Sequence, residues 1–178
     1  MTSEAAIEPT PAPDYIEALT AWRAWNVVRY NADYRLASVF APMVWPTGEP
    51  LAAACLRQPR LLDLLRPAES HEAPGSGCEC GIYGTSLPAV GDYLLALVGR
   101  AGAGRVVGEV ALWGEVVECE RGFRASLAYP HRLYVPTGCT HRDGWEVARA
   151  LADYGVPVEL VPGRGSEAMR ELERRLAA

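Results

Sequence analysis

A β-rich stretch between Tyr93 and Tyr129 constrains the fold of this chain more than any other feature. Three apolar segments are separated by turn sequences at Gly102-Ala103-Gly104 and Arg121-Gly122. The segments are residues 93–98, 106–117 and 123–129. Short β-forming runs joined by glycine-containing turns are typical of consecutive antiparallel strands. We therefore expect an antiparallel β meander here.

The segment at residues 106–117 has a pattern that predicts a bend or a β-bulge. Val110, Leu112 and Val116 share one parity, so that one face of the strand is expected to be buried. Gly114 lies among them, and a glycine inside a strand is typical of a bend or a β-bulge. We therefore expect the strand to change direction at this glycine.

The C-terminal part of the chain changes to a helical period. Residues 143–154 place Trp145, Ala148, Leu151 and Ala152 on one stripe, and Gly155 follows as a helix stop. Residues 156–161 predict a strand parallel to residues 133–135, reached by a right-handed crossover. Ser166 is expected to cap a last helix with Met169, Leu172 and Leu176 on its inner face. The predicted fold is α+β: an antiparallel β meander or small barrel-like sheet with a C-terminal strand-helix-strand-helix segment.

The N-terminal half has weaker patterns. Residues 1–14 are rich in proline and alanine and predict a flexible tail, and residues 15–178 are long enough for a single globular α+β domain. Residues 15–30 predict a short helix that runs into a strand, residues 35–40 a second strand, and residues 57–65 a short amphipathic helix. Residues 70–84 have the composition of a loop.

Charge and hydropathy narrow the class of protein. The formal net charge of −5 argues against a nucleic-acid partner held by phosphate contacts, which need a surplus of cations. The sequence has neither an apolar run long enough to cross a membrane nor an N-terminal export signal, so we expect a cytoplasmic protein without membrane contact. Its five cysteines are then expected to be thiols or metal ligands rather than disulfides.

One cluster of residue types predicts a metal site. Cys55 precedes the predicted helix, and the loop that follows this helix contains His71, Cys78 and Cys80. Three thiolates and one imidazole are a common ligand set for a structural zinc ion. Only one residue separates Cys78 from Cys80, fewer than in most zinc knuckles, but in an extended segment their side chains would point the same way. The sequence therefore predicts structural Zn²⁺ bound by these four residues.

Two other interpretations of the cysteines stay open. Free cysteines are often simply buried, which would leave His71 as an ordinary loop residue. Alternatively Cys78 or Cys80 is a redox-active or nucleophilic thiol whose pKa is lowered by His71, an arginine or a metal. A second pair, Cys139 and His141, has His131 near it in sequence but does not make a site alone.

Several motifs resemble an uncharacterised family of hypothetical proteins from actinobacteria and other GC-rich bacteria. The resemblance spans roughly residues 22–158 and rests on these segments: Trp45-Pro46 with residues 48–51 and Cys55, His71-Glu72-Ala73-Pro74, Cys78-Glu79-Cys80-Gly81-Ile82-Tyr83, residues 110–118, residues 122–125 and Ala128-Tyr129-Pro130. Gly84 stands where we expect alanine. The resemblance implies a bacterial cytoplasmic protein and groups the four metal-ligand candidates, without implying a reaction.

Three functions are compatible with these features. The first is a zinc-stabilised binding or interaction module, whose partner is a protein or a small ligand. The second is a thiol- or zinc-dependent enzyme that uses the loop with Cys78, Cys80 and His71. The third is a nucleic-acid-binding small β-barrel with an aromatic pocket formed by Trp113, Tyr129 and Arg124.

Overall fold

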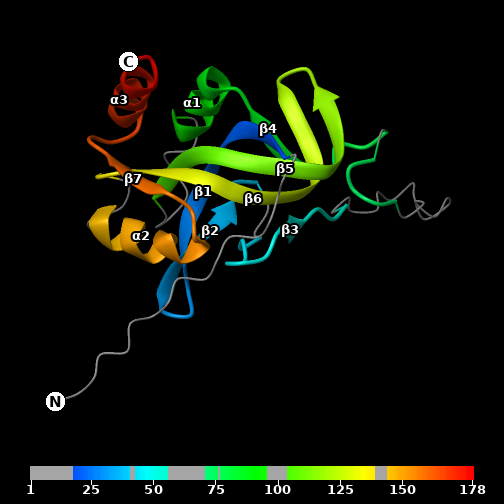
Figure 1. Ribbon diagram of the computed structural model, residues 1–178, viewed down its shortest axis with the longest axis horizontal. Helices are drawn as coiled ribbons and strands as arrows, with labels where there is room; N and C mark the ends of the chain where they lie inside the picture. The colour runs from blue at the N-terminus through cyan, green and yellow to red at the C-terminus, as the bar shows by residue number, and fades with distance from the viewer. Residues whose placement is uncertain (1–17, 41–42, 56–70, 76, 96–103, 139–143) are drawn as a thin grey trace, which may run out of the picture.

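The computed structural model describes residues 18–40, 43–55, 71–75, 77–95, 104–138 and 144–178. These residues form an α+β fold around a seven-stranded sheet (Figure 1). The elements in chain order are β1 (Leu19–Tyr30), β2 (Asp33–Ser38), β3 (Leu51–Ala52), β4 (Ile82–Thr85), α1 (Leu87–Leu95), β5 (Arg105–Cys119), β6 (Gly122–Pro136), α2 (Gly144–Leu151), the 3-10 helix η2 (Ala152–Tyr154), β7 (Val158–Val161) and α3 (Ser166–Leu176).

The sheet is mostly antiparallel and nearly closes into a ring. β1 pairs with β5, β5 with β6, β6 with β4, and β4 returns to β1 through the pair Trp22↔Thr85. β2 extends the sheet from β1, whereas β3 and β7 join β6. The predicted fold class is confirmed: the chain combines a small barrel-like sheet with a C-terminal helical segment.

The β5–β6 hairpin contains the predicted bulge. Its register shifts between Trp113 and Val116, where Gly114 has a φ of 76°. The Ser126 hydroxyl fills the gap and accepts a hydrogen bond of 2.9 Å from the backbone N–H of Glu115. Val116 was expected on the buried face, but it is 39% exposed because the extra residue interrupts the two-residue alternation of the strand.

The C-terminal segment is also confirmed in outline. β7 pairs with β6 in parallel, with Leu133 opposite Val158. Gly155 ends the helical turn with a φ of 68°, as its position after the stripe predicted. The cap of the last helix was predicted wrongly: Gly165 occupies the N-cap, and Ser166 is the first residue of α3.

Three other local predictions need correction, and two lie outside the described residues. Residues 19–30 are strand throughout, so the helix predicted before them is absent from residues 18–30. Residues 93–95 end helix α1 and do not form the first strand of the meander. The predicted loop at residues 70–84 ends in strand β4. The helix predicted at residues 57–65 and the tail at residues 1–14 lie outside the described residues, and the prediction of one domain stays a prediction.

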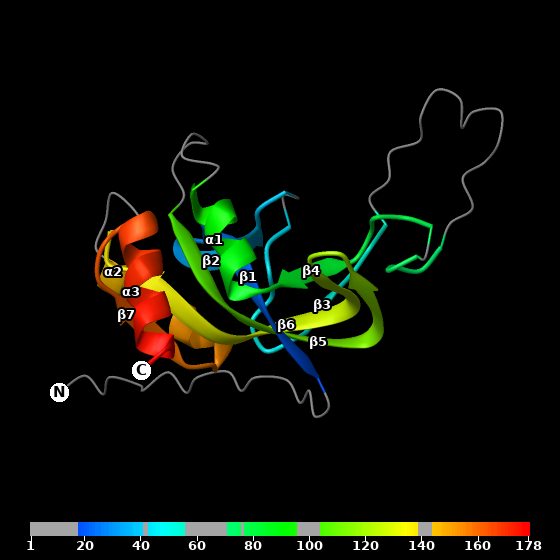
Figure 2. The same cartoon turned by 90° about the horizontal axis from the view of Figure 1, so that it is seen from above.

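Helices cover the sheet on two sides (Figure 2). One hydrophobic cluster joins the inner side chains of the ring to Val147 and Leu151 of α2. A second cluster lies on the other face, where Val90 of α1 and Leu172 of α3 pack against Tyr134. Because β1 contributes Trp25 to the first cluster and Ala24 to the second, both of its faces are covered. None of the helices in the described ranges is long and apolar enough to cross a membrane.

A buried tyrosine joins the segments around the first cluster. The hydroxyl of Tyr154 accepts a hydrogen bond from Leu36 N–H at 3.0 Å and donates one to Trp45 O at 2.8 Å. Burial raises the pKa of Tyr154, so that this hydroxyl keeps the proton it donates. Tyr129, also fully buried, donates to Tyr154 O at 3.0 Å. These hydrogen bonds connect η2 to β2 and to the segment that follows it.

Substituting alanine for Gly114 should destabilise the fold by about 1–3 kcal/mol. A β-carbon there would lie 2.2 Å from Ser126 Oγ, on a residue whose φ is positive. The matched control is Gly91→Ala inside α1, where the nearest side-chain atom is 3.7 Å away and the change should be neutral or stabilise by up to about 1 kcal/mol. Urea unfolding of both variants measures the difference, and equal stabilities would contradict the bulge.

Removing the Tyr154 hydroxyl by Tyr154→Phe should lower the free energy of unfolding by about 2 kcal/mol, because a buried N–H and a buried carbonyl lose their partner. The matched control is Tyr30→Phe, since Tyr30 is 51% exposed and the change should cost less than about 0.5 kcal/mol. Thermal unfolding by circular dichroism compares the two. A Tyr154→Phe protein as stable as the control would show that water replaces the lost hydroxyl.

Candidate metal centre

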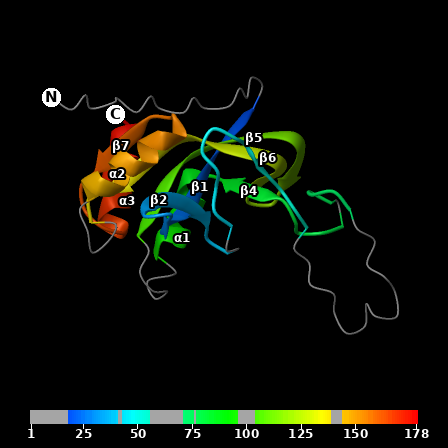
Figure 3. The same cartoon turned by 90° about the horizontal axis from the view of Figure 1, so that it is seen from below.

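The two chain segments that carry the cysteine ligands are both held by β6. β3 pairs with Leu127 and Ala128 of β6, and Ala53 N–H continues the ladder to Ser126 O at 2.7 Å, two residues before Cys55. β4 pairs with the next part of β6, and Cys80 precedes β4 by two residues. Neighbouring positions on one strand therefore bring together two segments that lie far apart in the sequence. Figure 3 shows β4 and the loop before it at the end of the sheet away from α2 and α3.

The four predicted ligands meet in space. Their ligand atoms, the sulfurs of Cys55, Cys78 and Cys80 and a ring nitrogen of His71, all lie within 4.8 Å of one another. We call these four residues the Cys3His cluster. Cys55 Sγ is 3.8 Å from Cys78 Sγ, and His71 Nε2 is 3.2 Å from Cys80 Sγ. A tetrahedral zinc ion with bonds of about 2.3 Å to sulfur and about 2.0 Å to nitrogen holds sulfurs about 3.8 Å apart and sulfur and nitrogen about 3.5 Å apart. The two measured distances are close to these values, so the cluster is consistent with a zinc site.

The loop before β4 is shaped by a tight turn rather than by the extended strand that the spacing of Cys78 and Cys80 suggested. Cys78 N–H donates to Gly75 O at 3.1 Å, and Gly75 N–H donates to Cys80 Sγ at 3.2 Å. A β-carbon on Gly75 would lie 2.5 Å from the His71 ring. Gly75 therefore lets the imidazole and a thiol approach the same point, a role that the sequence analysis missed.

The surroundings of the thiols favour an anionic cysteine. The backbone N–H of Cys80, together with contacts from the Cys80, Cys55 and His71 side chains, lowers the pKa of Cys78 to about 7. Burial raises the pKa of Cys80, and the hydrogen bond from Gly75 N–H opposes that shift. Since zinc binds thiolates, a low pKa at Cys78 reduces the cost of releasing its proton on metal binding.

The other candidate residues do not extend the cluster among the described residues. Cys119 is a free cysteine at the end of β5, and His131 lies in β6. Cys139 and His141 lie outside the described residues. The aromatic pocket predicted for nucleic acid is not formed, because Tyr129 is fully buried and Arg124 is only 7% exposed.

Arg124 contacts the metal-site loop instead. Its guanidinium Nη1 donates to the carbonyl oxygens of Cys78 and Cys80, the latter at 2.9 Å. The side chain starts on β6 opposite Tyr83 of β4 and passes beneath Gly81, where a β-carbon would lie 3.2 Å from Arg124 Cβ. No local sequence pattern indicates this contact, because it depends on the pairing of β4 with β6.

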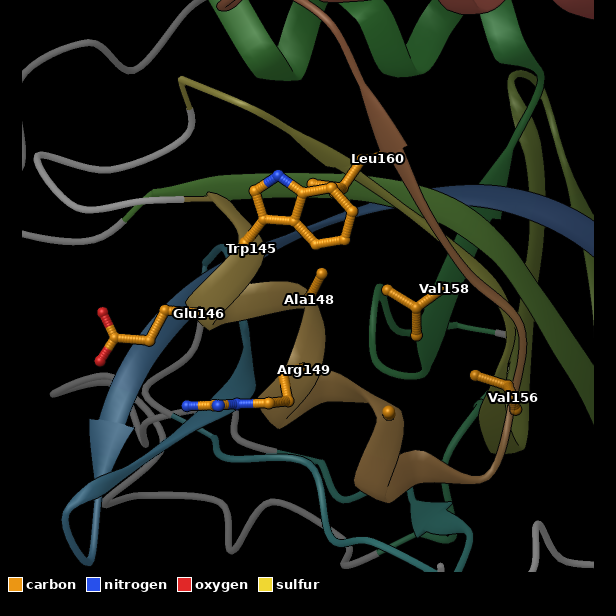
Figure 4. A pocket seen from close by; sticks show the side chains of 8 residues that line it. Trp145, Glu146, Ala148, Arg149, Val156, Val158 and Leu160 are labelled. Atoms are coloured by element: carbon orange, nitrogen blue, oxygen red, sulfur yellow. The ribbon is translucent and has the colours of Figure 1, made fainter.

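An open groove of about 800 Å³ lies between α2 and β7 (Figure 4). Trp145 was expected on the inner stripe of the helix but is 68% exposed, because Gly144, Val147 and Leu151 form the buried face of α2. Trp145 and Ala148 form one side of the groove, and Val158 and Leu160 of β7 form the other. Arg149 lies at its rim.

Comparison with known proteins adds no relative: no protein-family profile matches the chain, and neither a curated protein nor a solved structure is significantly similar to it. The resemblance to the actinobacterial family therefore stays a prediction. The geometry of the Cys3His cluster is the observation from which the function must be argued.

Protein purified without a histidine tag or a chelator should contain one zinc ion per chain. Cys80→Ser should lose most of it, because a hydroxyl is a much poorer zinc ligand than a thiolate. The matched control, Cys119→Ser, removes a cysteine outside the cluster and should keep the metal. Metal content is measured by inductively coupled plasma mass spectrometry. Equal zinc in all three proteins, or none in the wild type, would rule out the predicted ligand set.

Proposed function

We propose that the protein is a zinc-stabilised binding or interaction module, in which Cys55, His71, Cys78 and Cys80 hold a structural zinc ion. The observation that most supports this proposal is that four ligand atoms of suitable type lie within 4.8 Å of one another. Four protein ligands complete a tetrahedron, and a zinc ion bound in this way has no open position for a substrate or for water. The ligand set therefore supports a structural rather than a catalytic role.

The position of the cluster supports a stabilising function. His71 is exposed and the three cysteines are half-buried, and among the described residues 71–75 and 77–81 only Ala73 and Pro74 are buried. Such a loop buries little apolar surface with which to offset the entropy lost on ordering it. Zinc would supply this free energy, since ligation of a site that forms only in the folded chain contributes directly to folding.

The groove between α2 and β7 supports the binding part of the proposal. The groove combines an exposed tryptophan and aliphatic side chains with Glu146 and Arg149, and tryptophan and arginine are enriched at protein interfaces. In the ion pairs formed within the described ranges, no carboxylate pairs with Arg149. The occupant that fits is a protein segment that inserts an apolar side chain beside Trp145 and offers a carboxylate to Arg149.

The alternative of a thiol- or zinc-dependent enzyme has one supporting observation, the lowered pKa of Cys78. The same shift favours metal ligation. Zinc content separates the two, because a free nucleophile requires a metal-free Cys78, whereas the structural site requires a bound one. The nucleic-acid alternative loses its predicted pocket with the burial of Tyr129 and Arg124.

Removing zinc should lower the melting temperature. With free zinc about 1,000-fold above its dissociation constant, linkage adds about 4 kcal/mol to the free energy of unfolding. Differential scanning calorimetry of the wild type with and without a chelator, and of Cys78→Ser, measures this term; the chelator should leave Cys78→Ser unchanged. If the chelator removes zinc and the melting temperature does not change, the protein binds zinc but the ion has no structural role.

A further inference from the structure

Arg124 is a buried charged residue of β6, with 7% of its surface exposed. Its guanidinium donates to two neutral carbonyl groups, those of Cys78 and Cys80. The ion pairs formed within the described part of the chain do not include it. Those pairs join half-buried or exposed arginines on the surface, such as Arg132 with Glu159. Arg124 thus has hydrogen-bond acceptors but no carboxylate partner in this set.

A buried guanidinium without a counter-charge is costly, because hydrogen bonds to neutral carbonyls replace only part of its lost hydration. The carbonyls that Arg124 contacts belong to two of the zinc-ligand candidates. Zinc with three thiolates and one neutral imidazole has a net charge of −1, since two positive charges meet three negative ones. A bound metal centre would therefore place one negative charge beside this buried guanidinium.

We propose that Arg124 is the counter-charge and positioning residue of the metal centre. This inference rests on the proposed zinc site and adds to it a residue outside the ligand set. The guanidinium donates to the carbonyls of Cys78 and Cys80, and these hydrogen bonds keep the loop in the conformation that places the two sulfurs near the metal. Its charge stabilises the anionic centre over the metal-free loop, and the centre in turn offsets the burial of the charge.

Substitutions at this position can test what the guanidinium contributes. One Nη1 atom donates to both carbonyls, on a stem that passes beneath Gly81. A lysine at this position keeps the charge but places its donor on a stem of different length and shape. A glutamine keeps a donor but loses the charge. The two substitutions therefore separate the electrostatic contribution from the geometric one.

Zinc affinity, measured by competition with a chromophoric chelator, tests the proposal. Arg124→Gln should weaken binding by about 10–100-fold, the usual effect of removing a group that supports metal ligands. Arg124→Lys should recover at least half of that loss on a logarithmic scale. The matched control is Arg132→Gln, a partly exposed arginine on the same strand that pairs with Glu109 and Glu159 and should leave the affinity unchanged.

A double-mutant cycle separates the charge from a purely structural clamp. Cys55→His makes the bound centre neutral and alters a ligand that Arg124 does not contact, so that Arg124→Gln in this background should weaken zinc binding by less than about threefold. An equal loss in both backgrounds, or an Arg124→Lys protein as weak as Arg124→Gln, would overturn the electrostatic role while leaving the zinc site standing. A wild-type protein that binds no zinc would overturn the proposed function itself and this inference with it.

Discussion

The pairing of β6 with four other strands is the interaction on which the rest of the structure depends. One edge of β6 follows β5 along most of its length. The other edge pairs, from the start of β6 to its end, first with β4, then with β3 and then with β7. Buried backbone groups must find partners, and a strand of 15 residues provides enough of them for several short segments in a row. Each short strand then has a fixed place relative to the others.

The candidate metal centre is a consequence of that order. Cys55 follows β3 and Cys80 precedes β4, and these strands occupy adjacent positions on β6, so that Cys55 and Cys78 meet although 23 residues separate them in sequence. The same strand contributes Arg124, which lies opposite Tyr83 of β4 and donates to the carbonyls of Cys78 and Cys80. The sheet thus brings the two ligand-carrying segments together. In the proposed site, the metal and Arg124 stabilise the loop before β4, which buries little apolar surface.

The sequence predicted those parts of the fold whose signal is local. The bulge at Gly114 and the helix stop at Gly155 follow from backbone conformations that glycine adopts readily. The helix predicted within residues 15–30 failed for a tertiary reason. Trp25 packs into one hydrophobic cluster and Trp22 against the other, and a strand covered on both faces loses the alternation that would reveal it. The four ligands were found because their residue types are chemically specific.

By itself, the sequence determined the ligand types, the turn at Arg121-Gly122 and the order of the C-terminal strands and helices, because each depends on residues that are neighbours in the chain. Only the tertiary structure decided which side chains became buried or exposed. Arg124 is buried because β4 lies beside β6, and Trp145 is exposed because α2 packs through Val147 and Leu151. Such outcomes depend on strand register and helix rotation, which are set by contacts between distant segments and leave no local pattern.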